Sequence, residues 1–134
     1  MKKTILVLTA SILIIGCSKK RVLIDELENK SENWLESVMY SQGELFTGIG
    51  YDIYDNGQLQ TEQSYTNGVL NGAWKEWYKD GKIWSEGNYK EGKEHGLEKW
   101  WHQNGELKFK GDYNNGELVS QICFDESGAE TNCK

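Results

Sequence analysis

Three cysteines are the residues of this chain whose positions predict covalent chemistry, and the first of them is Cys17. It follows an N-terminal segment in which two lysines precede an uncharged apolar run at residues 4–15. A basic start, a short apolar run and a small residue at Gly16 are typical of an export signal. The run is too short to span a bilayer as a helix, which needs about 20 residues. We therefore expect residues 1–16 to be removed as a signal peptide.

The residues around Cys17 predict what happens to its thiol. Ile14, Ile15 and Gly16 directly before Cys17 resemble the bacterial lipobox, in which the cysteine receives a diacylglycerol group and becomes the new N-terminus. The resemblance implies a lipoprotein of the cell envelope, held to a membrane by lipid on Cys17, with palmitate among its acyl chains. Because Ser18 and not an aspartate follows, we expect the outer membrane if the cell has two. An ordinary secretory signal with a chance cysteine is the alternative.

Cys123 and Cys133 are the two thiols that remain once lipid blocks Cys17. Export brings them to an oxidising compartment, where disulfides persist. They lie symmetrically about Gly128, so a C-terminal hairpin with an odd-length loop would place them directly opposite each other, within disulfide range. We expect a disulfide that pins the C-terminal end of the fold. Two reduced thiols are the alternative.

The other reactive side chains are not spaced as metal ligands or catalytic groups usually are. His95 and His102 lie in different predicted strands without a cysteine or acidic cluster at ligand spacing, so no metal site is predicted. No nucleophile has an evident base. The acidic residues mostly fall on the polar sides of predicted strands, although their number keeps paired carboxylates for glycoside hydrolysis open as an alternative. We predict no enzyme and no cofactor.

Charge limits the class of partner. Removing residues 1–16 leaves enough chain for one domain and moves the formal charge from −6 to −8, because Lys2 and Lys3 are lost. Lys19, Lys20 and Arg21 follow the lipidated cysteine, and beyond them acidic residues outnumber basic ones about two to one. The basic triplet has two readings. It could bind an anionic leaflet, where each charge adds about 1 kcal/mol to the binding free energy, or it could belong to a solvated tether. The acidic body argues against nucleic acid as a partner.

The elements that would position these residues belong to an internal repeat. The units are 48–71, 72–95 and 96–119. The same residue types recur in register, three times each: Gly48, Gly72, Gly96; Gly57, Gly81, Gly105; Gly68, Gly92, Gly116; Tyr65, Tyr89, Tyr113; and Leu59, Ile83, Leu107.

Each unit predicts two antiparallel strands joined by turns. Asn-Gly, Asp-Gly or Glu-Gly pairs occur twice in every unit and suit the positive φ of hairpin turns. Alternation in 83–89 and 107–113 is typical of half-buried strands, and alternation in the preceding strand would put Trp74 and Tyr78 on one face. We predict an all-β fold: an antiparallel meander of stacked two-stranded repeats forming a solenoid-like sheet.

Residues 72–92 also resemble a known family. They read G-x-W-x-x-W-Y-x-x-G-x-x-x-x-x-G-x-Y-x-x-G, which is similar to the MORN repeat and more closely to its bacterial variant in YwqK-type, antitoxin-labelled proteins. The resemblance extends over 45–119, and the first unit departs from it, with Gly50 in place of Trp74 and Gln63 in place of Gly87. It implies an all-β repeat sheet used for binding, without catalysis.

The flanking segments are expected to cap the repeats, because the ends of a solenoid need capping. We assign 17–33 to a lipidated tether and N-terminal segment, 34–47 to an opening hairpin with a turn at Gln42-Gly43, and 120–134 to a C-terminal capping hairpin.

Aromatic residues form the candidate binding surface: Trp74, Tyr78, Trp84 and Trp100. A sheet hides one face, so some of them should be exposed as a platform for a sugar or a partner protein. Alternatively, a curled sheet or the N-terminal segment buries them.

The predicted function is a membrane-anchored, non-catalytic binding or scaffold module, held by lipid on Cys17 and docking an unidentified protein or glycan partner. Two alternatives remain at this point: an antitoxin or immunity-type protein that neutralises a toxin, and an envelope glycan hydrolase.

Overall fold

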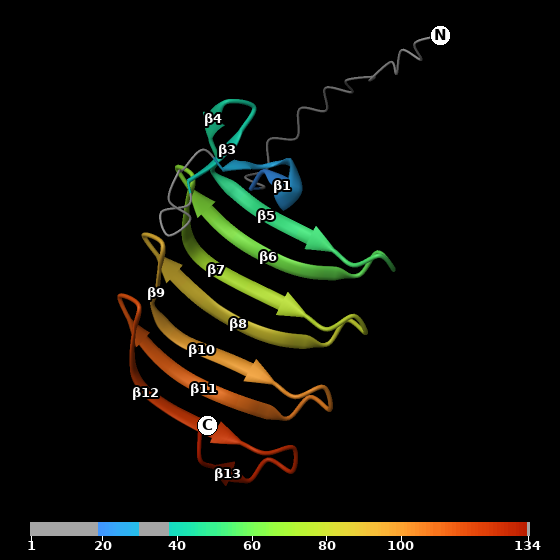
Figure 1. The fold of residues 1–134 in the computed structure, drawn as a ribbon, viewed down its shortest axis with the longest axis vertical. Coiled ribbons are helices and arrows are strands. Elements are labelled where there is room, and N and C mark those ends of the chain that lie inside the picture. Colours follow the sequence, from blue (N-terminus) through green and yellow to red (C-terminus); the bar gives the residue numbers. More distant parts are fainter. Residues whose placement is uncertain (1–18, 30–37, 134) are drawn as a thin grey trace.

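The computed structural model describes residues 19–29 and 38–133, and nearly all of them belong to strands or turns. Figure 1 shows strands stacked in chain order as one curved layer. A ten-stranded sheet runs β1-β5-β6-β7-β8-β10-β11-β12-β13 with β9 beside β8, and a three-stranded sheet runs β2-β3-β4. The elements are β1 (Arg21–Leu23), the 3-10 helix η1 (Ile24–Glu26), β2 (Glu28–Asn29), β3 (Met39–Ser41), β4 (Glu44–Leu45), β5 (Gly48–Ile53), β6 (Leu59–Thr66), β7 (Val69–Trp77), β8 (Ile83–Lys90), β9 (Lys93–Glu94), β10 (Gly96–Trp101), β11 (Leu107–Asn114), β12 (Glu117–Phe124) and β13 (Glu130–Thr131).

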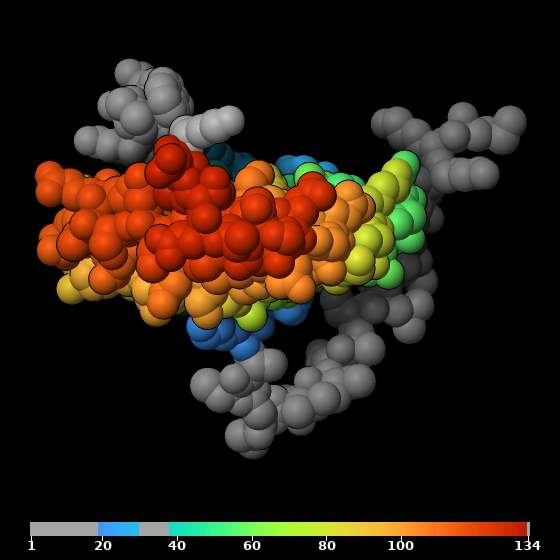
Figure 2. Space-filling model, turned by 90° about the horizontal axis from the view of Figure 1, so that it is seen from below, coloured from blue at the N-terminus to red at the C-terminus, as the bar shows by residue number. Residues whose placement is uncertain are grey.

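The fold class predicted from the sequence is confirmed: from β5 to β13 the sheet is an antiparallel meander with two long strands for each repeat unit. Viewed from the C-terminal end of the stack, the body is a slab that is wider than it is thick (Figure 2). Among the described residues, no second layer covers the two later repeats.

Two kinds of turn connect the strands. Between β8 and β9, Glu91 and Gly92 both have positive φ, 51° and 80°, as a type I′ turn requires. The turn before β8 differs, because only Gly81 has positive φ, at +85°. Tyr78 and Lys82 close this longer loop through a backbone hydrogen bond of 2.8 Å. The register then shifts between Glu76 and Trp77, which is a β-bulge.

Register divides the side chains between two faces, because residues opposite each other in neighbouring strands point the same way. We call one side the tyrosine face, which carries Tyr65, Tyr89 and Tyr113. We call the other side the lysine face. The row Lys75–Glu86–Lys99–Lys110 crosses β7, β8, β10 and β11 on the lysine face.

The hydrophobic core lies at the N-terminal end of the stack. Leu27, Phe46 and Tyr65 are buried together, and the rings of Phe46 and Tyr65 are 5.7 Å apart. Val22, Met39 and Leu70 pack against this cluster. The described segments before the first repeat thus cover the start of the tyrosine face, and the buried cluster they form includes Tyr65 of the first repeat, with Leu70 of the same repeat packed against it.

The chain joins the fold soon after Cys17. β1 pairs with β5 in parallel, so Arg21–Leu23 extends the main sheet. Lys20 donates a hydrogen bond to Ser41 Oγ at 3.2 Å, and Arg21 pairs with Glu62. Within the stretch 17–33 assigned to a lipidated tether and N-terminal segment, Arg21 to Asn29 are part of the folded body.

The C-terminal hairpin contains the disulfide between Cys123 and Cys133, with a Cα–Cα distance of 5.3 Å. The expected register is wrong, because Cys123 lies opposite Thr131 and not opposite Cys133. Asp125 and Ala129 close the loop by a backbone hydrogen bond, which moves the pairing away from the expected one. Cys133 follows the end of β13 and reaches Cys123 diagonally.

Candidate functional site

The β-bulge between Glu76 and Trp77 divides the predicted aromatic surface. Trp74 lies opposite Gly87 on the tyrosine face, and Trp100 lies opposite Ser85 on the same face. Tyr78 comes after the bulge, and its ring is 6.3 Å from that of Trp84, which alternation places on the lysine face. Placing Trp74 and Tyr78 on one face was wrong, because the bulge adds one residue to the alternation.

The four candidates differ in exposure. Trp84 is 42% exposed and Trp100 is 36% exposed, whereas Trp74 and Tyr78 are half-buried. The expectation that some of these aromatic residues are exposed is therefore confirmed. The structure brings Trp74 and Trp100 together on the tyrosine face and leaves Tyr78 and Trp84 on the other.

Glycines let aromatic rings lie close to the sheet on the tyrosine face. A Cβ atom at Gly87 would be 2.6 Å from Trp74 Nε1, and a Cβ atom at Gly111 would be 2.6 Å from the Phe109 ring. Trp74 also contacts Tyr89 at 6.3 Å between ring centroids, and Trp100 contacts Phe109 at 4.5 Å. The result is an aromatic floor across β7 to β11.

Glu98 is the most unusual polar residue of this floor, because it is only 6% exposed. Its Oε1 accepts a hydrogen bond from Trp100 Nε1 at 2.6 Å, and its Oε2 has no well-formed hydrogen bond. Burial raises the pKa of the Glu98 carboxyl. The hydrogen bond from Trp100 opposes this rise, the charge of Glu94 adds to it, and the nearby Tyr113 hydroxyl, which makes no well-formed hydrogen bond to Oε2, opposes it. A buried carboxylate of this kind costs free energy unless it is fully paired.

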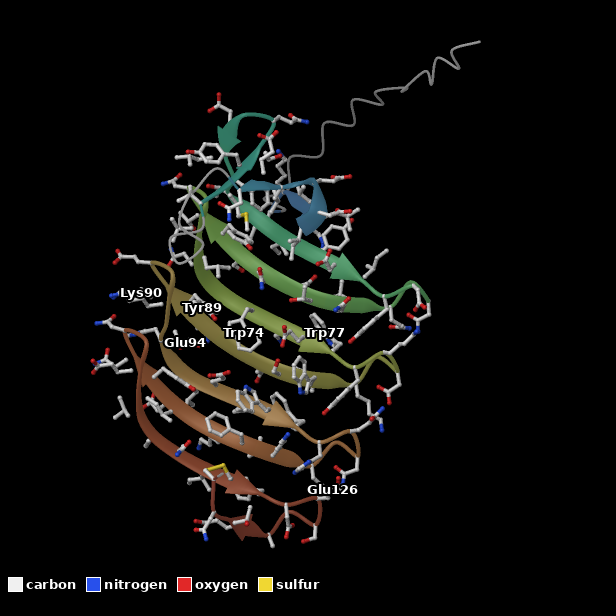
Figure 3. All side chains as sticks on the ribbon, in the orientation of Figure 1. Trp74, Trp77, Tyr89, Lys90, Glu94 and Glu126 are labelled. Atoms are coloured by element: carbon white, nitrogen blue, oxygen red, sulfur yellow. A yellow bond between two sulfur atoms is a disulfide. The ribbon has the colours of Figure 1, made fainter. Side chains whose placement is uncertain are left out.

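Two further carboxylates share this environment. Burial raises the pKa of Tyr89, and the charges of Glu94, Glu98 and Glu76 raise it further. Glu76 accepts a hydrogen bond from Ser85 Oγ at 2.7 Å. Figure 3 shows Trp74, Tyr89 and Glu94 near one another at mid-height of the stack. We call Glu76, Glu94 and Glu98 the carboxylate cluster.

The lysine face has a different electrostatic character. Glu86 pairs with Lys75 at 3.5 Å and with Lys99 at 3.7 Å, so its charge is compensated by neighbours in the row. Within the described residues, no ion pair involves a member of the carboxylate cluster. Acidic charge on the tyrosine face is therefore left without a cationic partner from the described part of the fold.

A groove continues the tyrosine face towards the C-terminal end. It has a volume of about 530 Å³ and is open to solvent. Part of its lining is aromatic or aliphatic, and the disulfide forms one side: Trp100, Phe109, Tyr113, Leu118, Phe124, Cys123 and Cys133. The rest is polar: Lys108, Gln121, Thr131 and Asn132. Trp100 and Tyr113 contact Glu98 as well, so they link the groove to the carboxylate cluster.

The two histidines lie at separate places in the fold. The His102 ring nitrogen Nε2 lies 3.0 Å from the Phe124 carbonyl oxygen, which links the third repeat to the C-terminal hairpin. His95 Nδ1 is buried without a hydrogen-bond partner. Across residues 19–29 and 38–133, no three histidine, cysteine or acidic side chains are grouped to hold a metal ion. Cys17, the predicted lipidation site, lies outside the described residues.

Comparison with known families gives the repeat its identity. Residues 46–67, 70–91 and 94–115 match the family described as MORN repeat variant. The chain carries three MORN-variant repeats. Their starts at positions 46, 70 and 94 have the same spacing as the repeat predicted from the sequence. No protein in a search of curated proteins matches the chain. In the part of the chain that is described, no helix is long and apolar enough to cross a membrane.

Aligning the MORN-variant repeats shows which site residues the sequence analysis missed. Glu94 stands where the neighbouring repeats have Leu70 and Leu118, and Glu98 stands where they have Trp74 or Gly50. Two acidic residues at positions that are otherwise apolar or glycine were a readable signal. It was overlooked because alternation alone does not show which face of a one-layer sheet becomes buried.

Proposed function

We propose that this protein is a lipid-anchored, non-catalytic binding module of the bacterial cell envelope, with its partner docking on the tyrosine face of the second and third repeats. The observation that carries the proposal is the aromatic floor with half-exposed Trp100 beside the groove. Repeat sheets of this kind suit binding, because each repeat adds surface to one continuous face.

The N-terminal sequence supports the anchor and sets an orientation. Cys17 is four residues before Arg21, the first residue of β1, so the connecting chain can span at most about 14 Å. Lipid on Cys17 would therefore hold the N-terminal edge of the sheet beside the bilayer. The stack of repeats would extend away from the bilayer. The tyrosine face would then be roughly perpendicular to the membrane plane and accessible to a partner.

A pull-down with paired variants tests the docking face. Cells expressing the intact lipoprotein, Trp100→Ala or Trp84→Ala are cross-linked, and the captured partners are compared. Both tryptophans are similarly exposed but lie on opposite faces, so Trp84→Ala controls for loss of an exposed indole. A partner lost with Trp100→Ala and kept with Trp84→Ala supports the proposal. Partners retained by both variants, or lost only with Trp84→Ala, contradict it.

A further inference from the structure

We infer that the carboxylate cluster and the aromatic groove beside it form a binding site for an organic cation, a primary ammonium or guanidinium group on an apolar stem. The inference rests on the proposed function and names the chemistry that the tyrosine face recognises.

The first step is the unmet hydrogen-bonding capacity of Glu98. A carboxylate this deeply buried normally has both oxygens paired, yet Oε2 has no well-formed hydrogen bond. Trp100 Nε1 fixes the orientation of the carboxylate through Oε1, so the group is held in place rather than free to turn towards solvent. An N–H donor from a ligand would satisfy the remaining oxygen.

The second step is charge. Glu94 lies opposite Tyr89 of β8, Glu76 lies opposite Ser85 of the same strand, and Glu98 bonds Trp100, which also lies opposite Ser85. The three carboxylates therefore share one region of the tyrosine face. Lys75, Lys99 and Lys110 lie in the row on the other face, where Glu86 pairs with two of them, and Lys108 lines the groove further along, away from the three carboxylates. The region therefore favours a ligand that is positively charged and excludes phosphate, sulfate and other anions.

The third step is the surroundings of the cluster. Trp100 bonds Glu98, Tyr89 lies opposite Glu94, and the Trp74 ring packs on Tyr89, so aromatic rings adjoin the cluster. Aromatic rings attract ammonium and guanidinium groups. The groove beyond Trp100 is lined by Phe109, Tyr113 and Leu118, which suits a methylene stem. A hydrated metal ion would not use these apolar walls, whereas a lysine or arginine side chain or a free polyamine would.

The test titrates the detergent-solubilised mature lipoprotein with two cations, pentalysine and spermidine, at low ionic strength. Pentalysine with acetylated side chains is the uncharged control probe. Binding is followed by calorimetry and by the indole N–H resonance of Trp100, which is assigned by its loss in Trp100→Phe. We expect at least one cation to bind and to move that resonance, and the acetylated peptide to do neither. Tighter binding of pentalysine indicates a side chain of a partner protein, and tighter binding of spermidine indicates a free amine.

Three variants locate the site. Glu98→Gln should weaken cation binding at least tenfold. Glu94→Leu should also weaken it several-fold and should fold, because leucine occupies this position in the neighbouring repeats. Glu86→Gln removes the same charge from the lysine face and should change the affinity less than twofold.

The inference is wrong if neither cation binds at millimolar concentration, if the acetylated peptide binds equally well, or if Glu98→Gln and Glu94→Leu bind like the unaltered protein. Equal weakening by Glu86→Gln would also overturn it, because binding would then follow overall charge. A partner captured through Trp100 but unaffected by Glu98→Gln would leave the proposed function standing and remove only the cation site.

Discussion

Trp74 and Gly87 show how a single pair of residues decides the packing of one repeat. The indole lies over a glycine of the neighbouring strand, where any side chain would collide with it. In the first repeat the pair is Gly50 opposite Gln63, and Tyr65 packs over Gly50 instead. In both repeats an aromatic ring thus lies close over a glycine of the neighbouring strand, although the glycine and the ring stand at different repeat positions.

Gly87→Ala should lower the free energy of unfolding by about 1–3 kcal/mol, because the new methyl group forces the Trp74 ring to shift. Trp74→Leu removes the ring, so adding Gly87→Ala to Trp74→Leu should cost much less. Denaturant unfolding of the two single variants and the double variant measures this coupling. Additive losses would show that the two side chains do not compete for the same space.

Glu98 predicts a pH dependence of stability. Its pKa lies above the ordinary 4.5 in the folded protein, so the folded state holds this proton more tightly than the unfolded chain. Its contribution to the free energy of unfolding is therefore largest below pH 4.5 and falls as the pH rises through the folded pKa. Glu98→Gln keeps an oxygen for Trp100 and removes the buried charge.

We expect Glu98→Gln to raise the melting temperature at pH 7.5, and the gain over the unaltered protein to shrink as the pH is lowered towards 4.5. Thermal unfolding across this range measures it, with Glu86→Gln as the control on the opposite face. A melting temperature lowered equally at both ends of the range would contradict the prediction. A stabilising substitution at a residue that binds ligand would fit the trade-off between stability and function.

At the scale of elements, polar side chains of the turns hold neighbouring repeats in register. The Tyr54 hydroxyl donates to the Trp77 carbonyl oxygen at 2.8 Å, and the Tyr78 hydroxyl donates to the Trp101 carbonyl oxygen at 2.7 Å. Asn56 and Asn104 make equivalent bonds to the next turn, at Lys79 and Glu126. Each turn is thus tied to the turn one repeat further on, in addition to the strand pairing.

Tyr78→Phe should lower the free energy of unfolding by about 0.5–1.5 kcal/mol, because it removes one hydrogen bond and leaves a carbonyl oxygen unpaired. Tyr54→Phe should have a similar effect, since it makes the same bond one repeat earlier. The two losses should add in the double variant to within about 0.5 kcal/mol. Urea unfolding measures all three, and an unchanged midpoint for both single variants would exclude a stabilising role.

The C-terminal hairpin depends on a covalent link as well. β13 pairs with only two residues of β12, so little backbone hydrogen bonding holds this last element. Cys123→Ser or Cys133→Ser should lower the free energy of unfolding by up to about 2–3 kcal/mol by the loop-closure argument. Mass spectrometry of the alkylated, non-reduced mature protein should find no free thiol at either position. Two alkylated cysteines would show that the bond does not form in the cell.

At the scale of the whole molecule, the two ends of the stack have different roles. The N-terminal end contains the buried cluster of Leu27, Phe46 and Tyr65 and would face the membrane. The C-terminal end exposes Val119 and Ile122 on β12 and is closed by the disulfide hairpin. The hydrophobic core and the membrane anchor would thus lie at one end of the stack, and the partner-binding surface would lie on the repeats between the two ends.

Lipidation is the prediction that concerns the whole molecule. The unaltered protein should fractionate with membranes as a mature form that begins at Cys17. Cys17→Ser should give an uncleaved precursor or a soluble protein, because the thiol that receives lipid is gone. Cys133→Ser is the matched control and should remain with the membranes. Mature Cys17→Ser protein in the membrane fraction would contradict the anchor.

Much of the fold follows from sequence alone, because period and turn chemistry are local properties. Glycine recurring at a fixed interval, asparagine or aspartate before it, and alternating strands identify the meander and its repeats without knowledge of any contact. The pairing of Cys123 with Cys133 also follows from their number and spacing. The sequence therefore determined the fold class, the repeats and the disulfide.

Only the tertiary structure decided which side chains meet. The bulge at Glu76 and Trp77 moves Tyr78 away from Trp74, and a loop that differs from the expected one moves Cys133 off the position opposite Cys123. Strand alternation holds only while the hydrogen-bonded ladder is unbroken, and one extra residue reverses every later side chain. Glu98 is buried among Trp100, two residues further along its own strand, and Tyr113, which the pairing of β10 with β11 brings to it. Strand alternation places Glu98 and Trp100 on one face but does not show that this face buries the carboxylate.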